Sequence, residues 1–236
     1  MKHIIKRSSP ELRRWFKGQP IVDGRRINVS YDDMPPDVKE AVKQSLLDEQ
    51  GGLCCYTGIR MDEDKSHIEH LKPQSRCVDH EDVDHEDVDY ANLLAAYPSN
   101  ECPFGARAKD EWYDVQLLVS PLDKRCESCF RFDLSGGIKP ANENDPAVIE
   151  TIRRLCLDHG SLTEMRKQAI NKALFPRSHR RSEAQLYKIT QSYCARNTRR
   201  QFPHFCFVIQ QTAQELLGKI ERRRKRKQAI RRQSRK

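Results

Sequence analysis

Residues 66–73 have the sequence Ser-His-Ile-Glu-His-Leu-Lys-Pro, and this stretch determines how the rest of the chain is interpreted. Polar and apolar residues alternate over residues 67–71, which predicts a short strand that ends at Pro73. Within it, a carboxylate residue, Glu69, is directly followed in the sequence by an imidazole residue, His70. A carboxylate can bind a divalent cation and an imidazole can take a proton from water, so the pair suits phosphodiester hydrolysis. A polar surface strand would show the same pattern, so the stretch alone does not decide between the two.

A second part of the pattern is Asn92, which precedes the apolar run Leu93-Leu94-Ala95-Ala96. An asparagine ahead of an apolar helical run can cap a helix. Alternatively, its side-chain amide can bond the backbone of the loop after His70 and so hold the imidazole in place. Both alternatives remain open at this point.

Changes in residue pattern divide the chain into four segments. Residues 1–52 contain an irregular arm and then a helix that begins at two prolines and ends at two glycines. Residues 53–140 have short apolar pieces, many turn residues and scattered cysteines and histidines. Residues 141–220 are helical, and residues 221–236 form a basic tail. The expected fold class is therefore α+β, with a compact centre, one helix before it and a helical region after it.

The helical region has recognisable starts and stops. Asp145 precedes a proline and is expected to cap a helix that Gly160 ends. Ser161 and Ser182 each begin a capping-box pattern for a following helix. Apolar residues recur every three or four positions in this region, so we assign them to the core, together with Cys156 and Cys206.

The positive charge of the chain is concentrated at its C-terminal end. The 236 residues include 43 Lys and Arg and 34 Asp and Glu, a net charge of +9. Residues 221–236 contain ten basic residues and one acid, so the remainder of the chain has 33 of each sign. This tail can contact nucleic acid, contact an acidic partner, or remain solvated.

The composition excludes several classes of protein. The longest apolar runs are about five residues, far below the roughly 20 that a membrane span needs, so no membrane association is expected. No apolar stretch follows the charges at the start, so we expect no secretory signal. The nine cysteines are an odd number, which together with the missing signal favours reduced thiols in a cytosol.

An acidic repeat interrupts the central segment. VDHED occurs at 78–82 and again at 83–87, and seven of the eleven residues from 79 to 89 are acidic. Repulsion among these charges predicts an exposed, mobile loop without packed structure. The alternative is that His80 and His85 bind a metal ion.

The order of the motifs resembles that of the HNH endonucleases. The chain has Gly-Leu-Cys54-Cys55-Tyr56, then the Glu69-His70 stretch, then Asn92-Leu-Leu, and then a segment from Cys102 to Lys109. The likeness is strongest to the HNH proteins of Septu-type phage-defence systems, called PtuB, and their retron-associated relatives. Three further stretches support it: ELRRWFKG at 11–18, SPLDKRCESCFRFDLSGGIKP at 120–140 and IRRLCLDHGSLTEMRKQAI at 152–170.

The resemblance implies a ββα-metal fold over residues 53–140, built around one divalent ion, Mg²⁺ or Mn²⁺. It makes His70 the general base that activates water and Glu69 the metal ligand beside it. Asn92 corresponds to the central asparagine, which orients the base. Lys109 and Lys72 are then expected to contact the nucleic acid.

The sequence departs from the family at the last metal ligand. The usual histidine falls near Ala106 or Arg107, and neither side chain ligates a hard cation. Asp110 or Asn100 would supply an oxygen instead. His67 is a further candidate ligand, because alternate residues of a strand share one face and Glu69 lies two positions on.

Many HNH proteins also contain a structural zinc site. Cys126 and Cys129 have ligand spacing, and Cys54 and Cys102 would complete four sulfurs. The usual partners three residues after Cys54 and Cys102 are replaced, by Thr57 and Gly105. The alternative is a set of small buried thiols.

The function that the resemblance implies is a metal-dependent endonuclease that cleaves DNA or RNA, including tRNA, as the toxic effector of an antiphage system. Its partners would be a PtuA-type ATPase and, indirectly, a retron reverse transcriptase with its RNA–DNA product. The main alternative is a non-catalytic zinc-knot adaptor that binds nucleic acid. A third is an interaction protein in which Glu69 and His70 are ordinary surface residues.

Overall fold

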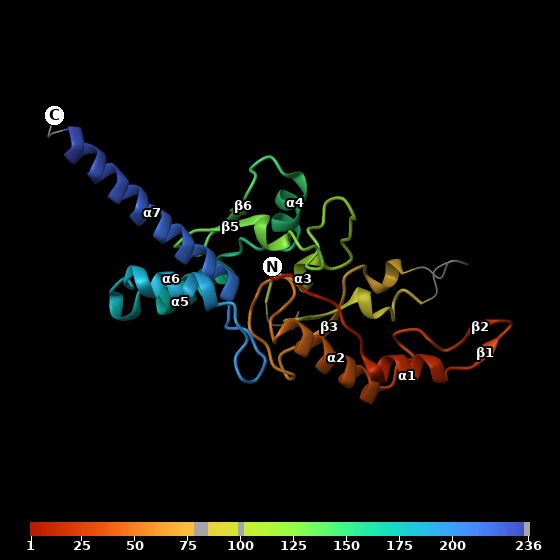
Figure 1. Ribbon diagram of the computed structural model, residues 1–236. Helices are drawn as coiled ribbons and strands as arrows, with labels where there is room; N and C mark the ends of the chain where they lie inside the picture. The colour runs from red at the N-terminus through yellow and green to blue at the C-terminus, as the bar shows by residue number, and fades with distance from the viewer. Residues whose placement is uncertain (78–84, 99–101, 234–236) are drawn as a thin grey trace.

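A computed structural model describes residues 1–77, 85–98 and 102–233, and side chains up to residue 230. Helices and small antiparallel sheets alternate along the chain, which confirms the α+β class (Figure 1). The helices are α1 (Pro10–Gly18), α2 (Pro36–Gln50), α3 (Ala106–Lys109), α4 (Pro146–Arg154), α5 (Gly160–Leu174), α6 (Glu183–Ser192) and α7 (Cys206–Gln233). The strands pair as β1 (Ile21–Val22) with β2 (Arg25–Arg26), β3 (His67–His70) with β4 (Leu93–Ala96), and β5 (Phe130–Phe132) with β6 (Ile138–Pro140).

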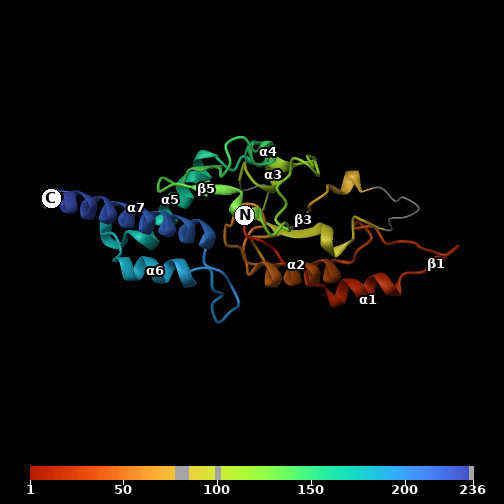
Figure 2. The same ribbon diagram turned by 45° about the horizontal axis from the view of Figure 1, so that its top comes forward.

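The N-terminal segment is more regular than the sequence pattern suggested. Part of the predicted irregular arm forms α1, whose Ser9 side chain accepts a hydrogen bond from the Leu12 backbone and whose first residue is Pro10. The short β1–β2 hairpin follows and projects from the body (Figure 2). The predicted helix before Gly51 is present as α2, with Gly51 in the left-handed conformation.

The strand predicted at residues 67–71 is β3, and it pairs with β4 in the register Glu69 to Leu94 and His70 to Leu93. The apolar run after Asn92 is therefore a strand, not the helix that one alternative required. All four residues of β4 are buried, and α2 packs against them. The buried Gln50 amide both donates to the Ala95 carbonyl and accepts from the Ala95 amide, so the second edge of β4 is also hydrogen-bonded.

The C-terminal helices pack beside this centre, and α7 packs on α5 and α6 (Figures 1 and 2). The caps predicted at Asp145 and Ser182 are present. The prediction at Ser161 is wrong, because α5 begins at Gly160 and the His159 side chain caps it. Gly160 therefore starts a helix instead of ending one.

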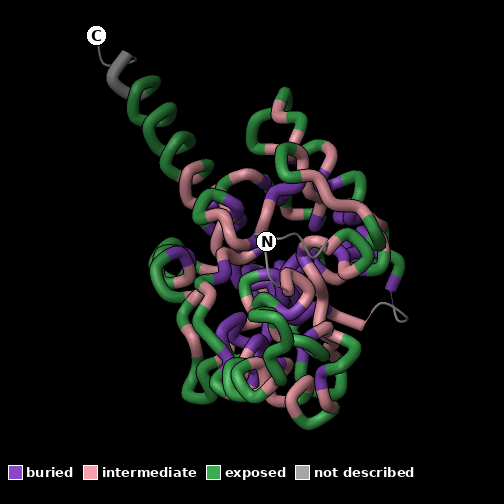
Figure 3. Tube along the Cα trace, turned by 90° about the vertical axis from the view of Figure 1, so that its right-hand side faces the viewer, coloured by how far each residue is buried: buried purple, intermediate pink, exposed green. Residues whose placement is uncertain are grey.

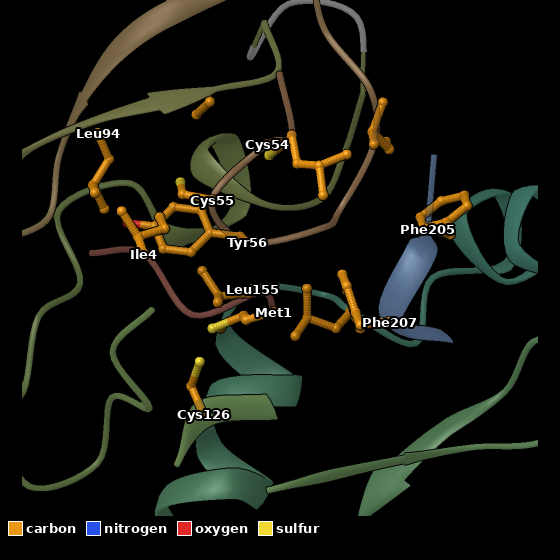
Figure 4. Close-up of a cluster of buried hydrophobic side chains, with 14 of the residues drawn as sticks. Met1, Ile4, Cys54, Cys55, Tyr56, Leu94, Cys126, Leu155, Phe205 and Phe207 are labelled. Carbon is orange, nitrogen blue, oxygen red and sulfur yellow. The ribbon is translucent and has the colours of Figure 1, made fainter. Parts of the chain in front are cut away.

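One hydrophobic core links the segments 1–52, 53–140 and 141–220. Met1, Tyr56 and Leu155 meet near its centre, with Phe207 beside them (Figure 4). Cys206 is fully buried as expected, whereas Cys156 is only half-buried, because it lies in a left-handed turn after α4.

Burial falls toward the C-terminal end of the chain. The start of α7 is buried, but its basic second half extends away from the body and is exposed up to residue 230 (Figure 3). The predicted basic tail is thus helical as far as residue 233. Among the described residues, no helix combines the length and the apolar character that spanning a membrane requires.

Candidate active site

Five of the predicted site residues line one open pocket of about 320 Å³. Strand β3 contributes His67, Glu69 and His70, and the region of α3 contributes Lys109 and Asp110. The two groups are about 40 positions apart in the sequence, so the fold brings them together. The pocket is the place where the predicted chemistry is concentrated.

Glu69 is held by two donors on one of its oxygens. Its side chain is only 12% exposed. Oε1 accepts a hydrogen bond from the Tyr56 hydroxyl at 3.1 Å and lies 3.0 Å from the Lys109 ammonium. The other oxygen, Oε2, is 3.7 Å from Nε2 of His67. The face-sharing predicted for His67 and Glu69 is therefore present, and Oε2 is the oxygen nearer to the imidazole.

His70 is fixed by contacts from two distant segments. Its Nε2 lies 2.9 Å from the Asp87 carbonyl oxygen, and its ring packs edge-on against Tyr31, with centroids 4.6 Å apart. A carbonyl only accepts, so Nε2 bears the proton and Nδ1 is the basic nitrogen of the neutral ring. Burial lowers the pKa of His70 below its usual value. The imidazole is therefore neutral near pH 7 and able to take a proton.

Asn92 is buried and joins the two loops beside His70. Its Oδ1 accepts from the Lys72 amide at 2.8 Å, and its Nδ2 donates to the carbonyls of Lys72 at 3.1 Å and Glu86 at 3.2 Å. The Leu71 amide also donates to the Asn92 carbonyl, at 2.8 Å. This is the hydrogen bonding to the loop after His70 that the second alternative for Asn92 required.

Residues 85–87, the described part of the second copy of the acidic repeat, belong to this framework. Asp87 accepts from the Tyr31 amide at 2.6 Å through its carboxylate, and Glu86 forms an ion pair with Lys72. Val88 is buried. The prediction of an unpacked loop is therefore wrong for residues 85–89, because paired charges and a buried valine offset the repulsion. The first copy, with His80, lies outside the described residues.

The two lysines predicted to contact nucleic acid, Lys109 and Lys72, each form an ion pair with a carboxylate. Lys109 is 2% exposed, and its ammonium lies against Glu69 in the interior of the pocket. Lys72 is half-buried and paired with Glu86. Lys109 nevertheless lines the open pocket, and the Lys72 side chain is 27% exposed, so a contact of either with phosphate stays a prediction. The exposed Arg107 lines the same pocket and was not among the predicted contacts.

The predicted zinc ligands do not come together. In the view of Figure 4, Cys126 lies near Met1, and Met1 and Leu155 lie between Cys126 and Cys54. Burial raises the pKa of the Cys126 thiol to about 11. Within the described part of the chain, no three His, Cys, Asp or Glu side chains converge on one point.

The donor types of the pocket nevertheless suit a hard divalent cation. The carboxylates of Glu69 and Asp110 and the imidazole of His67 line it. Nδ1 of His67 is buried without a hydrogen-bond partner among the described residues. The residues of the pocket therefore have the right ligand atoms for such a cation. Glu69 is the most buried carboxylate among them. Asn100, the other predicted oxygen donor, lies outside the described residues.

Several contacts of this site have no signal in the sequence. Tyr31 lies 39 positions before His70, in a stretch without a recognisable pattern, and Tyr56 lies 14 positions before it. Only Tyr56 belongs to a quoted motif, and that motif gave it no role. The Asp87 carbonyl is a backbone atom, which no residue pattern identifies.

Comparison with known proteins gives one informative likeness. No family model matches the sequence. A protein of Vibrio cholerae serotype O1 biovar El Tor, named "Retron Vc95 putative HNH endonuclease", is 28% identical over 142 residues, which cover 58% of this chain and 67% of that protein. Its name agrees with the resemblance to HNH endonucleases and to their retron-associated members, and it does not mention the Septu systems. Over more than half of its length, this chain is thus similar to a protein named as an HNH endonuclease of a retron.

Proposed function

We propose that this protein is a metal-dependent HNH endonuclease that hydrolyses phosphodiester bonds in nucleic acid. The observation that supports this most directly is the joint placement of Glu69 and neutral His70 on β3, beside Lys109 and Asp110, in one open pocket. The name of the Vibrio cholerae relative agrees with the same activity.

In this proposal His70 is the general base. Its Nε2 proton is bound to the Asp87 carbonyl, so the ring accepts the proton of the attacking water at Nδ1. Tyr31 and Asn92 keep the ring and its loop in place and do not contact the substrate. The general base is thus oriented by groups from two other segments.

Glu69, with His67 and Asp110, would hold Mg²⁺ or Mn²⁺. When bound, the ion neutralises charge on the phosphate and on the leaving oxygen. The exposed Arg107 at the pocket would contact the phosphate backbone, and the basic half of α7 would add salt-sensitive contacts further away.

The proposed setting is antiphage defence in a bacterial cytoplasm. By the resemblance stated above, the chain would act as the toxic effector of a Septu or retron system, with a PtuA-type ATPase. A retron reverse transcriptase and its RNA–DNA product would restrain the pair. The retron name of the relative supports this setting. The substrate is DNA, with tRNA as the alternative.

The test is cleavage of plasmid DNA and of total tRNA by the purified chain, with Mg²⁺ or Mn²⁺, alone and with the ATPase. We expect His70→Ala to lose cleavage by roughly three orders of magnitude, as removal of a general base typically does. His179→Ala is the matched control, because His179 is exposed and lies in the connection between α5 and α6, outside the pocket. Cleavage that persists in His70→Ala would reject this function.

The zinc-knot adaptor is the weaker alternative. The altered last metal ligand favours it, but no three of its four cysteines converge on one point in the described part of the chain. An adaptor would bind nucleic acid equally well with His70→Ala and would never cleave it.

A further inference from the structure

The Lys109 ammonium has the surroundings of a bound cation. Its Nζ lies 3.0 Å from Oε1 of Glu69, 3.0 Å from the His70 carbonyl oxygen and 3.4 Å from the Asp110 carbonyl oxygen. Its side chain is 2% exposed. One carboxylate and two carbonyls form an oxygen shell of the kind that hard cations use.

These oxygens belong to the residues that the proposed function needs. Glu69 is the proposed metal ligand, the carbonyl is that of the general base, and Asp110 is the candidate second ligand. A divalent ion bound at Glu69 would therefore lie close to a buried ammonium. Like charges repel strongly where little water separates them, so the two cations compete for the same negative charge.

The ammonium is not needed to orient Glu69. The Tyr56 hydroxyl also donates to Oε1, at 3.1 Å, and both donors act on the same oxygen. A neutral donor alone would hold the carboxylate in this direction. What Lys109 adds is its positive charge.

We infer that Lys109 is a resident cation of the pocket, which keeps the affinity of the free protein for a divalent ion low. This inference rests on the proposed function and adds a regulation to it. A phosphate group brought by the substrate would offset the charge of Lys109, so nucleic acid and the divalent ion would each strengthen the binding of the other. The site would then be filled when substrate is present.

The experiment measures Mn²⁺ binding by the signal of free Mn²⁺ in electron paramagnetic resonance, on the full chain in a His70→Ala background that does not cleave. We expect Lys109→Met, which keeps the length of the stem and removes the charge, to bind Mn²⁺ about tenfold more tightly or better. Lys109→Arg keeps the charge and should not gain affinity. Adding Glu69→Gln to Lys109→Met should abolish the gain. Equal or weaker binding by folded Lys109→Met would overturn the inference.

A second measurement needs no change at position 109. Duplex DNA and tRNA are added in turn to the His70→Ala chain, and the affinity for Mn²⁺ is compared with and without them. We expect at least one of the two to raise the affinity severalfold, and a smaller rise in Lys109→Met. If neither nucleic acid alters Mn²⁺ binding, the inference fails, while cleavage by the unaltered chain would still establish the nuclease. If no variant binds Mn²⁺ and the chain never cleaves, both proposals fail.

Discussion

Two hollows of this molecule differ in size and in chemistry. The larger, about 930 Å³, lies between α5, α6 and the start of α7, and partly exposed apolar side chains such as Met165 and Ile189 line it. The smaller, about 320 Å³, lies between β3 and α3 and is lined mostly by polar and charged side chains. The residues from the nuclease motifs line only the smaller one.

This difference indicates that the candidate site is identified by the polar groups gathered in the smaller hollow, and not by the volume of a hollow. In the larger hollow, Lys172 and Lys188 are exposed and form no ion pair with any described residue. In the smaller one, the buried Lys109 is paired with Glu69, whose side chain is 12% exposed, and the Asp87 carbonyl holds His70. Burying charges is costly, so a paired arrangement of this kind points to a use for the charges.

After His70→Ala, the largest effect is expected from Glu69→Gln, which should lower cleavage by at least about 100-fold, because an amide holds a cation poorly. It also leaves the Lys109 ammonium buried without a counterion, at a cost of about 3 kcal/mol in stability. The measurements are initial cleavage rates at saturating Mg²⁺ and urea unfolding.

Two further variants separate the causes. Glu69→Gln with Lys109→Met removes both charges and should regain stability without regaining cleavage. Glu164→Gln, an exposed carboxylate on α5 paired with Lys167, should change the rate less than about twofold. Full cleavage by Glu69→Gln would mean that another residue holds the cation.

Asn92→Ala is expected to have the next largest effect. It leaves the Lys72 amide and two carbonyls without their partner, which should cost about 2 kcal/mol in the free energy of unfolding. Loss of the loop's position should lower cleavage by about 10-fold or more. Asn171→Ala is the matched control, because Asn171 is exposed on α5 near the larger hollow. An unchanged rate in folded Asn92→Ala would show that the hydrogen bonds of the Asn92 side chain do not position His70.

The sequence predicts the parts of the site that depend on local pattern. The alternation of polar and apolar residues over 67–71 predicts β3, and it places both Glu69 and His70 on this strand. The partners of His70 and Glu69 depend on contacts between distant segments, such as Tyr31 and Asp87, and no local period encodes those. The argument from charge repulsion also gave a wrong prediction for residues 85–89. The counterion and the hydrogen-bond donor that stabilise them, Lys72 and Tyr31, lie elsewhere in the sequence.

Strand β4 shows how tertiary contacts override a local signal. The run Leu93-Leu94-Ala95-Ala96 consists of good helix formers, yet it pairs with β3 and its other edge is bound by Gln50. The same holds for Lys109, which the resemblance assigned to phosphate. Its burial against Glu69 follows from the position of α3, which the sequence does not reveal.

A smaller effect is expected at His204, which lines the larger hollow. Burial, and secondarily the charge of Arg60, lower the pKa of His204 to about 4, and its Nδ1 accepts the Arg60 amide proton at 3.0 Å. The unfolded chain protonates this histidine near pH 6.5, so the folded state loses stability as the pH falls from about 6.5 to 4. Between pH 7 and pH 5 the loss should be about 1 kcal/mol, after allowing for solvent at this half-buried group.

The measurement is urea unfolding at pH 7 and pH 5. His204→Asn keeps an acceptor in place of Nδ1 but does not titrate, so its loss of stability over this range should be smaller by about that amount. His179→Asn should keep the loss of the unaltered chain. Equal losses in all three chains would mean that His204 is not protonated preferentially in the unfolded state.

The smallest effect, and the sharpest test of the comparison, is Lys188→Gln on the α6 wall of the larger hollow. Its ammonium is exposed, so the free energy of unfolding should change by less than about 0.5 kcal/mol. Cleavage by the isolated chain should change less than about twofold, because no residue of the proposed mechanism lies in that hollow.

Arg107→Gln, the same loss of one exposed charge at the smaller pocket, should instead raise KM severalfold, since it removes a proposed phosphate contact. If Lys188→Gln raised KM as much as Arg107→Gln, the nucleic acid would extend over both hollows, and the separation drawn between them would be wrong.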